Sequence, residues 1–150
     1  EISACLVGSE MCIRDRGKAD VKRSGEDITV FCYGLMVNYC LQAADILASD
    51  GIDVEVVDLR TVYPLDKATI IERSQRTGKV LLVTEDNLEG SIMSEVSAII
   101  AENCLFDLDA PIMRLAAPDV PSMPFSPTLE NEIMMNPEKI QDKMRELAQF

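Results

Sequence analysis

The chain has 150 residues, of which 47% are apolar and 27% charged, a balance typical of one globular domain with its own core. Its 26 acidic residues outnumber its 14 basic ones, and this net charge of −12 excludes nucleic acid as a partner, because nucleic acid binding needs a clustered positive surface. The absence of histidine excludes His-based general bases, triads and most zinc sites, and no apolar run approaches the roughly 20 residues of a membrane helix.

Residues 1–16 differ from the rest of the chain. They show no clear strand or helix period, and the stretch after Ser9 resembles translated sequencing-adapter text. Glu1, rather than a basic stretch, precedes their short apolar run, so a secretory signal is not expected. We interpret residues 1–16 as a non-native tail and expect a single domain over residues 17–150.

From residue 17 onward, strand and helix signals alternate. A short strand is expected over residues 19–23, and a β-branched and aromatic run predicts a buried strand over 28–32. Apolar residues recur at helical spacing over 36–48, and Gly51 stops that helix. Valines mark the next strand over 54–58.

The second half begins with a recognisable helix start. Asp66 can cap the free N–H groups, while Leu65 and Ile70 occupy the staple positions on either side. Gly78 ends this helix, and the apolar run over 79–84 predicts a strand buried on both faces, as in parallel sheets.

The last elements follow the same alternation. A polar loop over 85–90 leads to a helix over 92–100, and a final strand is expected over 112–115. Four prolines between residues 118 and 127 forbid a helix there and predict an extended surface path. Asn136 caps a terminal helix that carries proline in its first turn.

This alternation predicts the fold class. Strand–helix–strand crossovers imply an α/β domain with a mainly parallel sheet between two layers of helices.

Sequence motifs for catalysis or cofactor binding are mostly missing. The sequence has no glycine-rich phosphate loop, no serine nucleophile elbow and no Gly-Asp-Gly that opens a thiamine diphosphate site. Two acidic clusters, at residues 85–87 and 107–109, offer oxygen ligands for hard cations, but neither has calcium-loop spacing. Solvated loop acids are therefore the favoured interpretation.

Arg60 leaves a strand at the edge where open α/β sheets bind ligands. Its planar fork could hold a carboxylate or phosphate. It could equally pin the loop through an internal salt bridge, and we favour this structural role.

The cysteines indicate a reducing compartment. Their number is odd and their spacing does not match a metal knuckle: Cys5, Cys12, Cys32, Cys40 and Cys104. Cys32 ends an apolar strand and Cys40 lies on an apolar helix stripe, so we predict buried free thiols and a cytoplasmic location. The acidic charge leaves two possibilities open, a basic protein partner or simply a solvated surface.

Motifs over nearly all of residues 17–150 resemble the C-terminal domain of the transketolase family. The matching segments are Asp27-Ile28-Thr29-Val30, Tyr33-Gly34, Asp58-Leu59-Arg60-Thr61, Pro64-Leu65-Asp66, Thr84-Glu85-Asp86, Gly90-Ser91-Ile92-Met93-Ser94-Glu95, Leu108-Asp109-Ala110-Pro111, Arg114, Ala117-Pro118-Asp119 and Leu129-Glu130. The resemblance is strongest to beta subunits of 2-oxo acid dehydrogenase first components. Residues 89–96 and 106–109 are most similar to the pyruvate and acetoin branch.

The resemblance implies a five-stranded mixed sheet, sandwiched by helices, whose antiparallel edge strand is residues 19–23. It implies a heterotetramer of two alpha and two beta subunits that cleaves its substrate on thiamine diphosphate, with magnesium, and passes the acyl group to a lipoyl arm. The cofactor-activating half of the beta subunit is not in this sequence, so we expect the fragment to bind no cofactor and to be inactive alone. Many family members have histidine at the position of Thr84, so no histidine-dependent role carries over.

The implied role is scaffolding and docking. Expected partners are the alpha subunit, a second beta subunit, and the small basic peripheral subunit-binding domain of the dihydrolipoyl acyltransferase core. Asp107, Asp109 and the terminal carboxylate of Phe150 are candidates for docking that domain, although the two aspartates could be ordinary solvated turn residues. Arg60, Met123 and Phe125 are assigned to a subunit interface, the latter two because an extended proline-rich path would expose them.

A second class of function stays open. The chain could be a freestanding protein-binding module that reuses the fold, because fold alone does not determine function. The foreign-looking start of the sequence favours a truncated subunit, and the unbroken gene would decide between the two.

Overall fold

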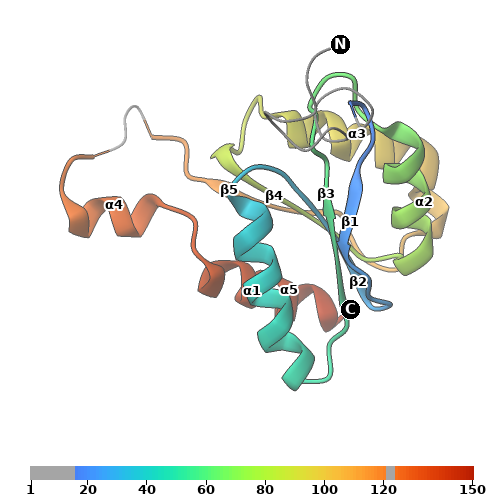
Figure 1. Cartoon of the computed structure of the whole chain (residues 1–150), viewed down its shortest axis with the longest axis horizontal. Coiled ribbons are helices and arrows are strands. Elements are labelled where there is room, and N and C mark those ends of the chain that lie inside the picture. The colour runs from blue at the N-terminus through green and yellow to red at the C-terminus, as the bar shows by residue number, and fades with distance from the viewer. Residues whose placement is uncertain (1–15, 121–123) are drawn as a thin grey trace, which may run out of the picture.

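The computed structural model describes residues 16–120 and 124–150, in which strands and helices alternate along most of the chain (Figure 1). The elements in chain order are β1 Asp20–Arg23, β2 Ile28–Cys32, α1 Met36–Ser49, β3 Val54–Asp58, α2 Lys67–Thr77, β4 Val80–Asn87, α3 Ile92–Cys104, the 3-10 turn η1 Leu105–Asp107, β5 Met113–Ala117, α4 Pro127–Ile133 and α5 Pro137–Ala148.

The strands form one five-stranded sheet in the order β1-β3-β2-β4-β5. Strands β2 to β5 run parallel, and β1 pairs antiparallel with β3 at the edge. This arrangement confirms the mixed sheet with one antiparallel edge strand.

Helices cover both faces, which confirms the three-layer prediction. One core cluster joins the sheet to α1 and α5, and a second joins the opposite face to α2 and α3 (Figure 1). Neighbouring residues on β2 serve different faces: Val30 lies in the first cluster and Phe31 in the second. All five residues of β2 are buried, because it is a central strand with helices on both sides.

The predicted helix signals at Asp66, Gly78 and Asn136 are confirmed. The Asp66 carboxylate accepts a hydrogen bond from the backbone N–H of Thr69 at 3.3 Å and so caps α2. The Asn136 side chain likewise accepts from Lys139 N at 2.8 Å at the start of α5. Gly78 ends α2 with a φ of 65°, a left-handed conformation that favours glycine.

Most predicted bounds differ from the structure by a few residues at most, and two predictions were wrong in a way that has a physical reason. Strand β4 continues to Asn87 instead of ending at residue 84, because Asn87 still pairs with Ala117 of β5 after a shift in register. A helix, α4, begins at Pro127, inside the stretch that proline was expected to keep extended. Proline is tolerated in the first turn of a helix, where its missing N–H would have no partner. Figure 1 shows α4 standing away from the three-layer body.

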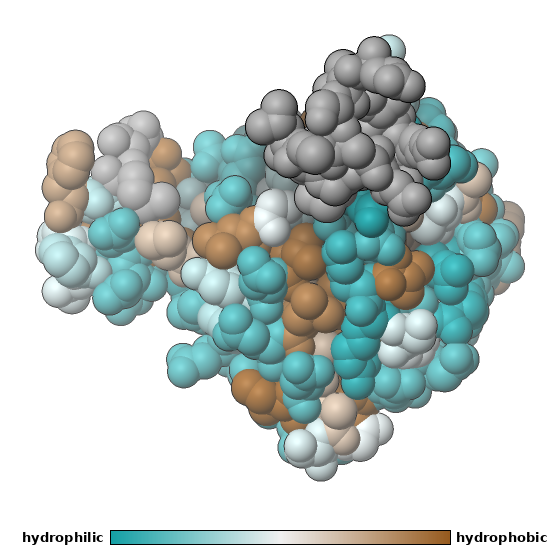
Figure 2. All heavy atoms as spheres, in the orientation of Figure 1, coloured by the Kyte–Doolittle hydropathy of each residue, from teal (hydrophilic) through white to brown (hydrophobic). Residues whose placement is uncertain are grey.

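The surface is mostly hydrophilic on the face drawn in Figure 2, with apolar residues gathered over its middle. Within the described residues, Cys32, Cys40 and Cys104 are buried and free, which confirms the thiol prediction for these three; Cys5 and Cys12 lie outside them. None of the helices in this part of the chain is both long and apolar enough to cross a membrane.

Candidate functional site

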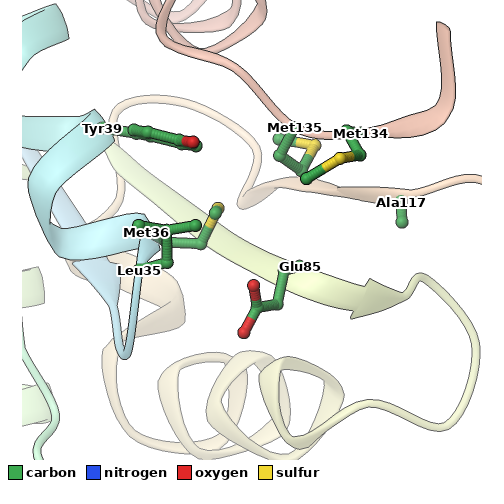
Figure 3. Close-up of a pocket in the computed structure, with 7 residues that line it drawn as sticks. All are labelled: Leu35, Met36, Tyr39, Glu85, Ala117, Met134 and Met135. Atoms are coloured by element: carbon green, nitrogen blue, oxygen red, sulfur yellow. The ribbon is translucent and has the colours of Figure 1, made fainter. Parts of the chain in front are cut away.

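A small pocket lies at the carboxyl edge of the parallel strands, where ligands bind in open α/β sheets. It has a volume of about 210 Å³ and is lined by Leu35, Met36, Tyr39, Glu85, Ala117, Met134 and Met135. Figure 3 shows Glu85 on β4, with Leu35 and Met36 to one side of it and Met134 and Met135 to the other. Its side chains come from β4, β5, the start of α1 and the segment before α5.

The lining of this pocket limits what it can bind. Among the described residues that line the pocket, Glu85 is the one ionisable group apart from the Tyr39 phenol, and none carries a basic side chain that could hold a phosphate. Its volume is also below the roughly 300–1,000 Å³ of most small-molecule sites. The chemistry therefore suits an apolar side chain and does not suit a diphosphate.

Thr84 has a structural role beside this pocket. Its side chain is 1% exposed, and its hydroxyl lies 2.9 Å from the hydroxyl of Tyr33. The same oxygen accepts a hydrogen bond from Asp86 N at 3.1 Å. The threonine thus joins β4 to Tyr33, the residue that follows β2.

The loop between β3 and α2 holds Arg60, one of the predicted interface residues. Arg60 Nη2 donates to Asp20 Oδ2 of β1 at 2.7 Å, which is the internal salt bridge favoured from the sequence. A hydrogen bond from Lys22, together with Arg60, lowers the pKa of Asp20. Arg60 also has a φ of 55°, a left-handed conformation that is uncommon for a residue other than glycine.

Asp66 ties the start of the domain to the same loop. Besides capping α2, its carboxylate accepts a hydrogen bond from Ala19 N at 3.1 Å. Burial opposes ionisation of this carboxyl, but the hydrogen bonds from Ala19 and Thr69 outweigh burial and lower its pKa. The segment entering β1 is therefore fastened to the β3–α2 loop.

The docking candidates lie at the opposite, amino edge of the parallel strands. Asp107 accepts a hydrogen bond from Gln75 Nε2 at 2.9 Å, and Asp109 N donates to Gly78 O at 2.8 Å, so both pack beside the end of α2. Phe150 follows α5, on the other face of the sheet, and is 62% exposed. The described contacts do not join Phe150 to either aspartate.

The remaining interface candidates differ in outcome. Phe125, two residues before α4, is fully exposed, which agrees with its expected exposure, while its place in an interface stays a prediction. Met123 lies outside the described residues.

Three exposed apolar side chains escaped the sequence reasoning. Phe106 is 98% exposed beside the two docking aspartates, and Val62 and Tyr63 are 44% and 84% exposed on the β3–α2 loop. Periodicity detects helices and strands, and these residues lie in a 3-10 turn and a loop, so it offered no signal.

The acidic clusters form no evident cation site. Glu85 and Asp86 are exposed at the end of β4, and Asp107 and Asp109 are exposed before β5. Across the described ranges, 16–120 and 124–150, no three His, Cys, Asp or Glu side chains lie close enough to hold a metal ion.

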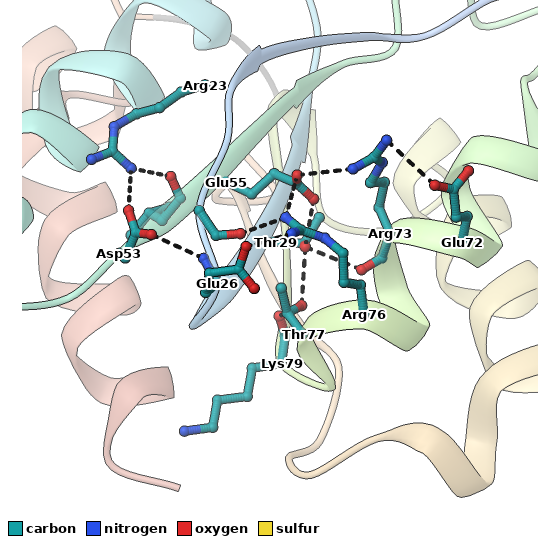
Figure 4. A network of polar contacts seen from close by, with 12 residues as sticks. Arg23, Glu26, Thr29, Asp53, Glu55, Glu72, Arg73, Arg76, Thr77 and Lys79 are labelled. Carbon is teal, nitrogen blue, oxygen red and sulfur yellow. Dashed lines mark hydrogen bonds and ion pairs between the residues drawn. The ribbon is translucent and has the colours of Figure 1, made fainter.

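A buried polar network was also missed (Figure 4). Glu55 of β3 is completely buried, and its carboxylate contacts Arg76 Nη2 at 2.6 Å and Arg73 Nη1 at 3.5 Å. The Thr29 hydroxyl donates to Glu55 at 3.1 Å and accepts from the Thr77 hydroxyl at 3.0 Å. The network anchors α2 to β2 and β3. The sequence signal was a single glutamate among the valines of a buried strand, because such a charge needs partners.

Comparison with known proteins identifies the domain. A sequence model described as "Transketolase, C-terminal domain" matches residues 17–140. Over 134 residues the chain is 68% identical to the 2-oxoisovalerate dehydrogenase subunit beta of Bacillus subtilis. It is 43% identical over 134 residues to the pyruvate dehydrogenase E1 component subunit beta of the same organism, and 42% identical over 124 residues to its acetoin:2,6-dichlorophenolindophenol oxidoreductase subunit beta.

These matches cover most of this chain but less than half of each relative. The first two cover 89% of the chain and 41% of the relative, and the third 83% and 36%. A solved structure described as a split gene transketolase, inactive beta4 tetramer, matches with a TM-score of 0.78 over 89% of this chain and 43% of that one. At 23% identity, this likeness supports the fold alone.

Proposed function

The chain belongs to the transketolase C-terminal domain family, and we propose that it is the C-terminal domain of the beta subunit of a 2-oxo acid dehydrogenase first component. The observation that carries the proposal is the 68% identity to a 2-oxoisovalerate dehydrogenase beta subunit over 134 residues. The enzyme would be a heterotetramer with an alpha subunit and a second beta subunit. The three buried free cysteines suit a reducing cytoplasm.

The proposed substrate is a branched-chain 2-oxo acid. The motifs at residues 89–96 and 106–109 favoured the pyruvate and acetoin branch. Identity to the pyruvate and acetoin relatives is 43% and 42%, however, against 68% for the 2-oxoisovalerate subunit. The test is to recover the intact gene, assemble its product with the cognate alpha subunit, and compare turnover of 2-oxoisovalerate, pyruvate and acetoin. Assembly without turnover of any of the three would contradict the proposal.

Thiamine diphosphate and magnesium belong to the complete enzyme in this proposal. The residues of the carboxyl-edge pocket do not fit a diphosphate, because no basic side chain lines it in the part of the chain that the structure describes. We therefore assign the domain a scaffold and docking role and no step of the reaction.

The proposed docking partner is the small basic subunit-binding domain of the acyltransferase core. Asp107, Asp109 and Phe150 are exposed at the amino edge of the sheet, and charge pairs at such a surface speed association and determine orientation. Changing Asp109→Asn and adding one residue after Phe150 should weaken binding by roughly 1–3 kcal/mol. The loss should shrink as salt rises, because exposed charges are screened within about 10 Å at roughly 0.1 M salt.

Calorimetry with the isolated binding domain measures this effect. The matched control is Asp119→Asn, which removes an exposed acid beyond the end of β5, at the opposite edge of the sheet. Equal affinity of the wild type and the docking variant at low salt would refute the assignment of these residues.

A further inference from the structure

An apolar surface projects from the β3–α2 loop. Tyr63 is 84% exposed and Val62 44%, and together with Pro64, Leu65 and Ile92 they line a depression of about 460 Å³. The other two lining residues are Lys67 and Glu95, so charged side chains border the apolar ones. An apolar patch bordered by polar groups is typical of a protein contact surface.

The chain enters the domain beside this surface. Gly17 N donates to the Thr61 hydroxyl at 3.0 Å, two residues before Tyr63. A Cβ placed on Gly17, whose φ is 79°, would come within 3.0 Å of Pro64 Cγ, so the two segments touch and leave no room for a side chain.

Two more contacts hold the entering chain in this place. Ala19 N donates to Asp66 Oδ2 at 3.1 Å, and Asp20 accepts from Arg60 Nη2 at 2.7 Å. All three partners, Thr61, Asp66 and Arg60, belong to the β3–α2 loop or its junction with α2. The described chain therefore enters the domain next to Val62 and Tyr63, with Gly17, Ala19 and Asp20 held by this loop.

We propose that this surface packs against the upstream part of the same polypeptide in the complete subunit. The inference rests on the proposed function, in which the chain is the C-terminal domain of a longer beta subunit. The match covers 41% of the 2-oxoisovalerate relative, so more than half of such a subunit lies outside the domain. Because Gly17 contacts the β3–α2 loop, any upstream part is covalently linked to a point beside this surface, which raises its effective concentration there relative to a partner arriving from solution.

The experiment compares one substitution in two contexts. The first is the 150-residue chain. The second is a complete subunit in which residues 17–150 replace the 68% identical segment of the Bacillus subtilis relative. The variant is Val62→Ser with Tyr63→Ser. The control is Leu105→Ser with Phe106→Ser, which changes side chains that are 60% and 98% exposed at the other edge of the sheet.

The readouts are the rate of proteolysis between the two parts of the subunit and hydrogen exchange of residues 17–23. In the complete subunit, the Val62/Tyr63 variant should raise the cleavage rate roughly tenfold, because lost apolar contact opens the junction. In the 150-residue chain the same variant should change the thermal midpoint and exchange only slightly, because Tyr63 is 84% exposed and Val62 44%. The control should match the wild type in both contexts.

Unchanged cleavage of the variant in the complete subunit would overturn the inference. So would a variant that weakens only assembly with the alpha subunit or with a second copy, because the surface would then be a subunit interface. The wild-type complete subunit separates this inference from the proposed function. If it assembles and turns over 2-oxoisovalerate while the variant is cleaved at the wild-type rate, the inference alone fails. If the wild-type subunit neither assembles nor turns over substrate, the proposed function fails.

Discussion

Removing Arg76 should destabilise the domain far more than removing a typical surface arginine. Arg76→Met keeps the aliphatic length of the side chain but deletes the guanidinium that lies 2.6 Å from the buried Glu55 carboxylate. Glu55 is 0% exposed, so water cannot replace the lost partner. Only Arg73, at 3.5 Å, and the Thr29 hydroxyl, at 3.1 Å, would remain to compensate the charge.

The expected cost is about 3 kcal/mol of unfolding free energy. Breaking a buried ion pair from one side costs roughly 3–5 kcal/mol, and the low end applies because Arg73 and Thr29 remain. For a domain of this size, that loss lowers the thermal midpoint by roughly 6–12 °C. Urea unfolding followed by circular dichroism measures the free energy directly.

The matched control is Arg145→Met. Arg145 Nη2 lies 2.9 Å from Asp50 Oδ2, but both side chains are more than 40% exposed, so the pair is worth about 0–1 kcal/mol. The double variant Glu55→Leu with Arg76→Met should be more stable than Arg76→Met alone, because it removes the unpaired buried charge. Equal losses for the Arg76 and Arg145 variants, or a double variant less stable than Arg76→Met, would refute this reasoning.

Three further predictions follow from the site. Asp66→Asn should lower the free energy of unfolding by about 1 kcal/mol at neutral pH. Because the pKa of Asp66 is lowered from 3.8 in the folded state, this stabilisation is present above pH 3.8 and is lost as pH falls below it. The unfolding free energies of the wild type and the variant, measured as pH is lowered, should therefore converge. Sedimentation should show a weak dimer that Phe125→Ser weakens further, whereas a strict monomer at high micromolar concentration would contradict the exposed Phe125 as a contact. The purified chain with thiamine diphosphate and magnesium should neither decarboxylate a 2-oxo acid nor cleave acetoin, and turnover above a cofactor-only blank would show that the assigned scaffold role is incomplete.

Local chemistry in the sequence predicted most elements and their ends. The β-branched run of β2, the helical spacing over α1 and the caps at Asp66 and Asn136 act over a few neighbouring residues, so their outcome can be read without the fold. The alternation of these elements predicted the layers, and the family resemblance supplied the antiparallel edge strand.

Contacts between distant residues decided the rest. Strand β4 extends to Asn87 because β5, 30 residues later, offers a partner at Ala117. Glu55 is tolerated in the sheet because α2 delivers Arg73 and Arg76 to it, and Arg60 is engaged because β1 brings Asp20 within 2.7 Å. Local propensity acts within a few residues, whereas each of these outcomes depends on groups that only folding brings together. For the same reason, the sequence identified Asp107, Asp109 and Phe150 as docking candidates, but only the tertiary structure separated them onto opposite faces of one sheet.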